Sequence, residues 1–187
     1  MNWQTRIVDA IRTQGERKAY DLGDAIAKQY TDISRINHFV AVSEHLARNK
    51  CEYIKPYDVA QVMINRDKQM YLIMERKPGI LLAELLFSDS MERTLAQQII
   101  TAYAHAVKNV LDTGIVPFDS KNLENALYQQ NAYLLDYDIW ELIPTKADQA
   151  LFRQDFSMHI TTLRRANGAP QREIVDELLL QILERSS

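Results

Sequence analysis

The stretch Thr113–Glu141, TGIVPFDSKNLENALYQQNAYLLDYDIWE, decides the fold that we expect for the rest of the chain. Two short apolar runs, 126–128 and 132–135, flank the polar turn 129–131, and this pattern predicts a β-hairpin after an acidic loop. Such a hairpin gathers two carboxylates and an amide at one of its ends: Asp119, Asn125 and Asp136. Oxygen donors of this kind are suited to holding Mg²⁺ and to directing a hydroxyl at a phosphate.

The composition indicates one well-packed domain, which can have two lobes. The chain has 187 residues, of which 47% are hydrophobic, and its formal net charge is −3. So small a net charge does not favour binding to nucleic acid or to an anionic membrane. No apolar run has the length of a membrane span, so we expect a soluble protein. The single cysteine, Cys51, excludes an internal disulfide and is expected to be a buried or half-buried side chain at a helix end.

The first part of the chain is predicted to be rich in strands. Residues 3–13 fit either a short helix or a first strand, because their periodicity does not decide between the two. Two hairpins follow, one with a tight turn at 22–24 and one around the charged turn 66–69. Their expected strands are 17–22, 25–30, 57–65 and 70–74. A helix over 35–49, capped by Asp32 or Ser34, is expected between the hairpins.

The second part is predicted to be mainly helical. Residues 75–79 form a polar link with Pro78 and Gly79. Asp89 and Glu92 can form a capping box at the start of a long helix, which Gly114 ends. The expected helices of this part are 91–112, 146–165 and 170–185.

The hairpin and its carboxylates resemble the catalytic and metal-binding loops of protein kinases. In that family an Asp is followed by an Asn, and an Asp-Phe-Gly triplet comes after an apolar strand. The corresponding residues here are Asp119, Asn125 and the triplet 136–138, in which Asp138 stands in place of the glycine. The spacing from Asp119 to Asn125 is one residue longer than usual, so that Glu124 stands where the Asn is expected.

Further segments extend the resemblance over residues 12–141, with gaps. Ala25–Lys28 is similar to the Val-Ala-Ile-Lys strand of kinases, and Thr13–Gly15 to a reduced form of their Gly-rich loop. Glu44 is the only carboxylate in the helix after that strand. Three runs resemble the very small kinases that some bacteria inject into host cells through type III secretion: 71–82, 114–119 and 125–128.

The resemblance implies an α+β, reduced protein-kinase-like fold that covers residues 1–187 as a single domain. A small lobe built on an antiparallel sheet would span about residues 1–76, and a truncated helical lobe about 77–187. In kinases the edge of the adenine bonds to the backbone of the link between these lobes.

The resemblance also implies the roles of the site residues. Lys28 would contact the α and β phosphates of ATP, Glu44 would hold Lys28, and Asp119 would accept or orient the attacking hydroxyl. Asp136 would bind Mg²⁺ together with Asn125 or, alternatively, Glu124. Further nucleotide contacts are expected from Gly15, Met74 and Arg76.

The implied function is ATP- and Mg²⁺-dependent transfer of the γ-phosphate to a serine or threonine hydroxyl of a protein. One alternative is a pseudokinase that senses nucleotide or binds a partner without catalysis, which the sparse glycine loop and Asp138 would suit. A second alternative is that the acidic residues form a solvated loop and that the kinase-like order is coincidental. The expected location is the bacterial cytoplasm, or a host cell if the protein is injected. By resemblance alone, the partners include a host protein substrate and the ubiquitin-conjugating machinery.

Overall fold

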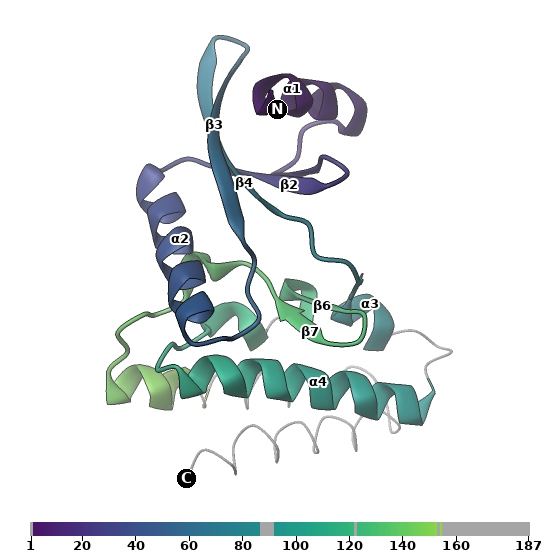
Figure 1. Ribbon diagram of the computed structural model, residues 1–187, viewed down its shortest axis with the longest axis vertical. Coiled ribbons are helices and arrows are strands. Elements are labelled where there is room, and N and C mark those ends of the chain that lie inside the picture. Colours follow the sequence, from purple (N-terminus) through teal and green to yellow (C-terminus); the bar gives the residue numbers. More distant parts are fainter. Residues whose placement is uncertain (1, 87–91, 122, 153, 155–187) are drawn as a thin grey trace. The chain divides into compact units, whose positions relative to one another are not determined.

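The computed structural model describes residues 2–86, 92–121, 123–152 and 154 of the chain (Figure 1). These residues form an α+β protein with two antiparallel sheets, which confirms the predicted class. The chain divides into two compact units. The first unit is Met1–His45 with Tyr53–Lys77, and the second unit is Leu46–Glu52 with Pro78–Ser187. Whether the two units form the single domain expected from the sequence stays a prediction.

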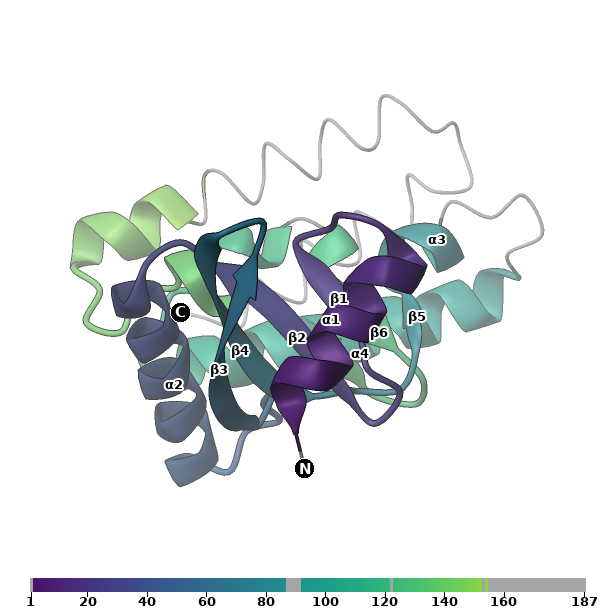
Figure 2. The same cartoon turned by 90° about the horizontal axis from the view of Figure 1, so that it is seen from above.

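The first unit contains a four-stranded antiparallel sheet in the order β1-β2-β4-β3, and all four strands are labelled in Figure 2. Its strands are β1 (Ala19–Asp21), β2 (Ala25–Tyr30), β3 (Pro56–Ile64) and β4 (Asp67–Glu75). Both predicted hairpins are present, since β1 pairs with β2 and β3 pairs with β4.

The turn of the second hairpin differs from the prediction. It consists of two residues, Asn65 and Arg66, whose φ values of 49° and 72° lie in the left-handed region. Strand pairing resumes at once with Ile64 opposite Asp67, so the expected four-residue turn 66–69 was wrong. A two-residue turn with positive φ at both positions matches the twist of the flanking strands, and the charged Asp67 and Lys68 therefore belong to β4.

Helix α1 (Trp3–Gln14) covers one face of this sheet, as both views show (Figures 1 and 2). The open choice between helix and strand for this segment is thus settled as helix. Asn2 is its N-cap and accepts a hydrogen bond from Thr5 N at 3.3 Å. Buried residues of α1 pack with alternate residues of the strands to form one core: Ile7, Ala10, Tyr20, Ala25, Ala27, Ala60, Val62, Tyr71 and Ile73.

Helix α2 (Ile33–Arg48) follows β2 and confirms the predicted helix to within two residues at its start. Of the two candidate caps, Asp32 immediately precedes the helix. Its carboxylate accepts hydrogen bonds from Ser34 N at 2.8 Å and from Ser34 Oγ at 2.6 Å. These bonds stabilise the charged form and lower the pKa of Asp32.

The second unit contains a three-stranded antiparallel sheet in the order β5-β6-β7. Its strands are β5 (Ile80–Leu81), β6 (Ala126–Tyr128) and β7 (Ala132–Leu134), and the last two form the predicted hairpin. The helices are α3 (Leu82–Leu86), which was not predicted, and α4 (Arg93–Asp112). Helix α4 buries most of its predicted core face: Ile99, Ile100, Tyr103, Val107 and Val110.

Helix α4 confirms the predicted long helix to within two residues at its start. The helix begins at Arg93, with Glu92 at the N-cap, and the Glu92 side chain makes no capping hydrogen bond. The other half of the expected capping box, Asp89, lies outside the described residues, as does Met91. Leu95 was assigned to the core face but is exposed, whereas its neighbour Ala96 is buried instead.

Beyond Pro144 a helix begins at residue 146, as predicted, and is described as far as 152. Thr145 and Asp148 form a reciprocal capping box: Asp148 Oδ2 accepts from Thr145 N at 2.7 Å, and Asp148 N donates to Thr145 Oγ1 at 3.2 Å. The rest of this helix and the predicted helix 170–185 lie outside the described residues. Among the described helices, none has the length and apolar composition needed to cross a membrane.

Candidate functional site

The segment from Val116 to Glu141 is closed at its two ends by a pair of backbone hydrogen bonds. Val116 N donates to Glu141 O at 3.0 Å, and Glu141 N donates to Val116 O at 2.9 Å. Between these residues lie the β6–β7 hairpin and three short 3-10 helices: η1 (Phe118–Lys121), η2 (Leu123–Asn125) and η3 (Tyr137–Ile139). The predicted acidic loop is therefore wrong in detail, because Asp119 and Glu124 lie within 3-10 turns.

Local hydrogen bonds explain why the chain turns at η1. The backbone oxygen of Pro117 accepts from Ser120 N at 2.9 Å and from Ser120 Oγ at 2.7 Å. Tyr103 on α4 adds a contact from far away in the sequence, since its buried hydroxyl donates to Ser120 O. Burial favours the neutral phenol and raises the pKa of Tyr103 well above its ordinary value. The backbone around Asp119 is thus fixed to a buried helix.

The segment brings three of the predicted site residues together. Asn125 Nδ2 donates to the backbone oxygen of Asp119 at 3.4 Å. Asn125 O in turn accepts from Leu135 N at 2.7 Å, next to the ladder pair Ala126 and Leu134. Because Asp136 follows Leu135, it lies at the same end of the hairpin as Asn125. The helices η1 and η3, which precede and follow the hairpin, also contact each other.

Asp136 has an unusual backbone conformation. Its φ and ψ of 58° and 75° are left-handed, a region that L-residues other than Gly, Asn and Asp rarely adopt. Such a conformation costs on the order of 1 kcal/mol and persists only where the surroundings impose it. The surroundings here include the buried Tyr137 and Trp140, whose ring centroids are 4.4 Å apart. Strain of this kind is concentrated at functional sites.

The donor atoms at this end of the hairpin suit a hard cation. Asn125 donates from Nδ2 to Asp119 O, so this bond does not use its Oδ1, and Asp136 adds a carboxylate at the same end of the hairpin. Glu124, the alternative ligand, is exposed on η2. Among the residues that the structure describes, no group of three or more His, Cys, Asp or Glu side chains could hold a metal ion. Mg²⁺ held by one or two protein oxygens together with substrate phosphates and water needs no such group, and its binding here stays a prediction.

The other predicted residues belong to the first unit, where the register places Lys28 and Met74 on one face of the sheet. Lys28 pairs with Leu72, and Ile26 pairs with Met74. Side chains alternate along a strand, and Ala25 and Ala27 face α1, so Lys28 and Met74 lie on the opposite face. Lys28 Nζ is 5.1 Å from the ring centroid of Tyr30. Glu44 is exposed on α2, and its pairing with Lys28 stays a prediction.

Gly15 does not lie in a loop between two strands. Thr13 and Gln14 are the last residues of α1, and Gly15, with φ of 74°, ends the helix and donates its N–H to Ile11 O at 3.1 Å. The expected phosphate-covering loop over Thr13–Gly15 was therefore wrong in its local structure, because the helical alternative for residues 3–13 prevailed. A role of Gly15 in binding nucleotide stays a prediction.

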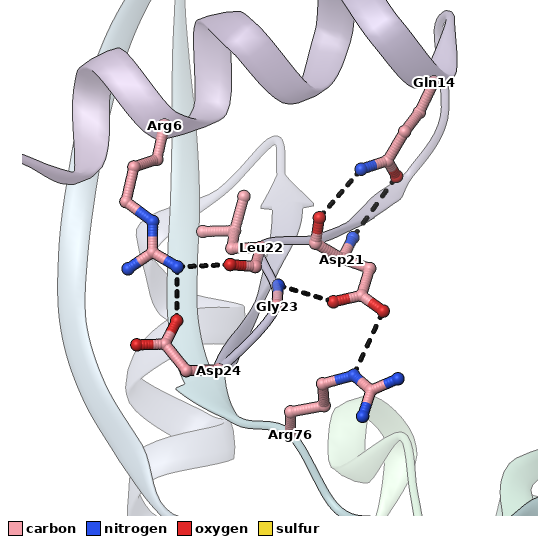
Figure 3. Close-up of polar contacts among 7 residues, drawn as sticks. All are labelled: Arg6, Gln14, Asp21, Leu22, Gly23, Asp24 and Arg76. Carbon is pink, nitrogen blue, oxygen red and sulfur yellow. Dashed lines mark hydrogen bonds and ion pairs between the residues drawn. The ribbon is translucent and has the colours of Figure 1, made fainter.

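Arg76 follows directly after β4, and the structure pairs it with a residue that the sequence did not single out. Arg76 Nε donates to Asp21 Oδ2 at 3.0 Å (Figure 3). The two residues are 55 positions apart, and no local pattern connects them. The available signal was the position of Asp21 at the end of a strand, before the turn at 22–24.

The second unit also has an open cavity of about 780 Å³ between α4 and the β6–β7 hairpin. Its lining combines apolar surface with polar side chains, which include Gln98, His105, Asn109 and Asn131. Cys51 is at its border, with Sγ donating to Asn109 O at 3.5 Å. Partial burial and the charge of Asp112 raise the pKa of this thiol, so it is not activated as a nucleophile. None of the predicted site residues lines this cavity.

Comparison of the chain with protein-family models and with the curated proteins finds no match.

Proposed function

We propose that this protein is a phosphotransferase of minimal protein-kinase type, which uses ATP and Mg²⁺ and transfers the γ-phosphate to a serine or threonine hydroxyl of a protein. The observation that carries the proposal is the hydrogen bond from Asn125 Nδ2 to Asp119 O, in a segment where Asp136 lies at the same end of the hairpin as Asn125. Phosphoryl transfer needs little covalent chemistry from a protein, since positioning and charge stabilisation supply most of the rate.

Each residue has a separate role in this proposal. The Asp119 carboxylate would accept or orient the attacking hydroxyl, and the bond to its backbone oxygen supports that role because it limits how the loop can move. Asn125 Oδ1 and the Asp136 carboxylate would hold Mg²⁺, which neutralises charge on the phosphates. Lys28 would contact the α and β phosphates, and Glu44 would orient Lys28.

One alternative has specific support. Gly15 ends a helix, so the glycine that would cover the phosphates is not in a flexible hairpin loop. Asp138 lies on η3 two residues after Asp136, and a second negative charge there would oppose the binding of ATP phosphates. Both observations favour a pseudokinase that binds nucleotide or a partner without transferring phosphate.

The partners and location remain part of the proposal. The acceptor would be a protein, in the bacterial cytoplasm or, if the protein is injected through type III secretion, in a host cell. The ubiquitin-conjugating machinery enters only through resemblance to the small injected kinases.

The proposal is tested by Mg²⁺-dependent ATP hydrolysis and autophosphorylation of the purified protein, with nucleotide binding measured separately. We expect Lys28→Ala and Asp136→Ala each to lower the rate by about 100-fold or more, as loss of a single charge-stabilising group does in other enzymes. Lys68→Ala, which removes an exposed lysine from β4, is the matched control and should retain the wild-type rate. A wild-type protein that binds nucleotide without turnover would establish the pseudokinase. A protein that neither binds nor transfers would overturn both readings.

A further inference from the structure

The pair Asp21–Arg76 belongs to a network of hydrogen bonds in the first unit (Figure 3). Asp21 uses both carboxylate oxygens, because Oδ2 accepts from Arg76 Nε at 3.0 Å and Oδ1 accepts from Gly23 N at 2.7 Å. Gly23 has a φ of 88°, so this bond also stabilises a turn that other residues would strain. The carboxylate therefore connects the turn between β1 and β2 to the residue just after β4.

Helix α1 fixes the backbone on which this carboxylate stands. The Gln14 amide makes two bonds to Asp21, donating from Nε2 to Asp21 O at 2.7 Å and accepting at Oε1 from Asp21 N at 3.3 Å. At the other end of the turn, Arg6 donates to Leu22 O and to the Asp24 carboxylate (Figure 3). The two bonds from Gln14 thus hold the backbone of Asp21 itself, whereas Arg6 holds the other side of the turn, at Leu22 and Asp24.

The strand register places Asp21 next to residues of the proposed nucleotide site. Asp21 pairs with Ile26, which pairs with Met74, so the three residues form one row across β1, β2 and β4. Paired residues share a face of the sheet, and this is the face that carries Lys28. Asp21 is therefore opposite Ile26, two residues before Lys28 on β2. It lies at the end of the sheet where β4 ends and Arg76 begins the link.

We propose that Asp21 is a positioning residue for the base of a bound adenine nucleotide, and that it acts through Arg76. This inference rests on the proposed function. Arg76 belongs to the link whose backbone would bond the adenine edge, and its ion pair with Asp21 reduces the conformations that this link can adopt. A link that is ordered in advance loses less entropy when the nucleotide binds, so the pair raises affinity without touching the phosphates.

The test compares two ligands, MgATP and adenosine, by calorimetric titration of wild type and Asp21→Asn. We expect Asp21→Asn to weaken both ligands by the same factor, about two- to fivefold, the range for an exposed ion pair. Lys28→Ala should instead weaken MgATP far more than adenosine, since adenosine has no phosphate. Arg76→Gln should match Asp21→Asn, and the double variant should be no weaker than either single one, because both changes remove one interaction.

Asp24→Asn is the matched control. This variant also removes, from the same turn, a carboxylate that pairs with an arginine. The arginine is Arg6 and not Arg76. The inference requires this variant to bind both ligands as wild type does. Unchanged affinity in Asp21→Asn, or an equal loss in Asp24→Asn, would overturn the positioning role while leaving the proposed function intact. If wild type binds neither ligand, the proposed function fails first, and the inference fails with it.

Discussion

Asn125 connects the two halves of the closed segment: its side-chain Nδ2 donates to Asp119 O at 3.4 Å, while its backbone oxygen accepts from Leu135 N at 2.7 Å. We predict that Asn125→Ala lowers Mg²⁺-dependent transfer by about 100-fold, because both the bond to Asp119 and the oxygen offered to the cation are lost. The stability cost should be small, about 1 kcal/mol. Rates measured over a range of Mg²⁺ concentrations, together with urea unfolding, separate the two effects.

Glu124 is the competing ligand, and its exposed position on η2 lets it be changed with little structural cost. We predict that Glu124→Gln keeps the Mg²⁺ dependence of wild type, because the proposed ligand is Asn125, whose side chain bonds to Asp119 O. The quantity to measure in wild type and in both variants is the Mg²⁺ concentration that gives the half-maximal rate. A large increase in that concentration for Glu124→Gln, with little change for Asn125→Ala, would assign the cation to Glu124 instead.

Gly79 lies where two segments of the chain approach each other closely, just before β5 pairs with β6. A Cβ at this position would be 2.9 Å from Tyr128 O, and the φ of 135° is itself strained for any L side chain. Gly79→Ala should therefore lower the free energy of unfolding by at least about 2 kcal/mol. Gly15→Ala is the control, because Gly15 has a φ of 74° with nothing within 4 Å of the added Cβ.

The Gly15→Ala cost should be about 1 kcal/mol, the strain of a left-handed backbone alone. Urea unfolding measures both variants. Equal costs would mean that β5 and β6 can separate to admit the methyl group, which contradicts a rigid contact between Gly79 and Tyr128.

Local sequence patterns predicted the helices and strands that form because of residues close together in the sequence. The β6–β7 hairpin follows from two apolar runs around a polar turn, and α2 follows from its apolar periodicity and the preceding Asp32. The α1 segment could not be decided in this way, because the burial of Ile7 and Ala10 against a sheet from later in the chain determines the outcome. Helix periodicity is informative only when the face it buries is also known.

The candidate site could likewise be predicted only in part from local sequence patterns. The order of Asp119, Asn125 and Asp136 is visible in the sequence, but the 3-10 turns that hold Asp119 depend on Tyr103, which lies on α4 and donates to Ser120 O. The pairing of Asp21 with Arg76 likewise joins residues 55 positions apart. Such contacts depend on how the chain folds in three dimensions, and no spacing rule connects the partners.

Tyr103 offers a direct test of that long-range contact. Tyr103→Phe removes the hydroxyl that donates to Ser120 O but keeps the buried ring, so the free energy of unfolding should fall by about 1–2 kcal/mol, as expected for a buried acceptor left without its donor. Tyr57→Phe is the control, because Tyr57 is exposed on β3. Equal stabilities of the two variants in urea unfolding would show that the Tyr103 hydroxyl adds nothing to stability.

The raised pKa of Tyr71 lets us predict how the stability of the protein changes at high pH. Its ring is fully buried in the core of the first unit, and its hydroxyl donates to Gln69 Oε1 at 2.6 Å. Burial, with a smaller contribution from Tyr20, raises the pKa of Tyr71 to about 12 from its usual 10.0. The folded state therefore keeps the proton at a pH where the unfolded chain has lost it.

The direction in which stability changes with pH follows from this difference in pKa between the folded and unfolded states. Stability from the neutral Tyr71 is fully present below pH 10 and is lost as the pH rises to about 12, because ionisation then favours the unfolded chain. The loss should be at most about 2 kcal/mol in wild type, because solvent screens the partly buried hydroxyl. Tyr71→Phe cannot ionise, so it should start less stable than wild type at pH 8, where it lacks the bond to Gln69, and lose less between pH 10 and 12. Urea unfolding at each pH measures the difference between the two proteins, in which all other titrating groups cancel. A constant difference from pH 8 to 12 would mean that the Tyr71 hydroxyl ionises as easily in the folded protein as in the unfolded chain, which its buried position in the core does not allow.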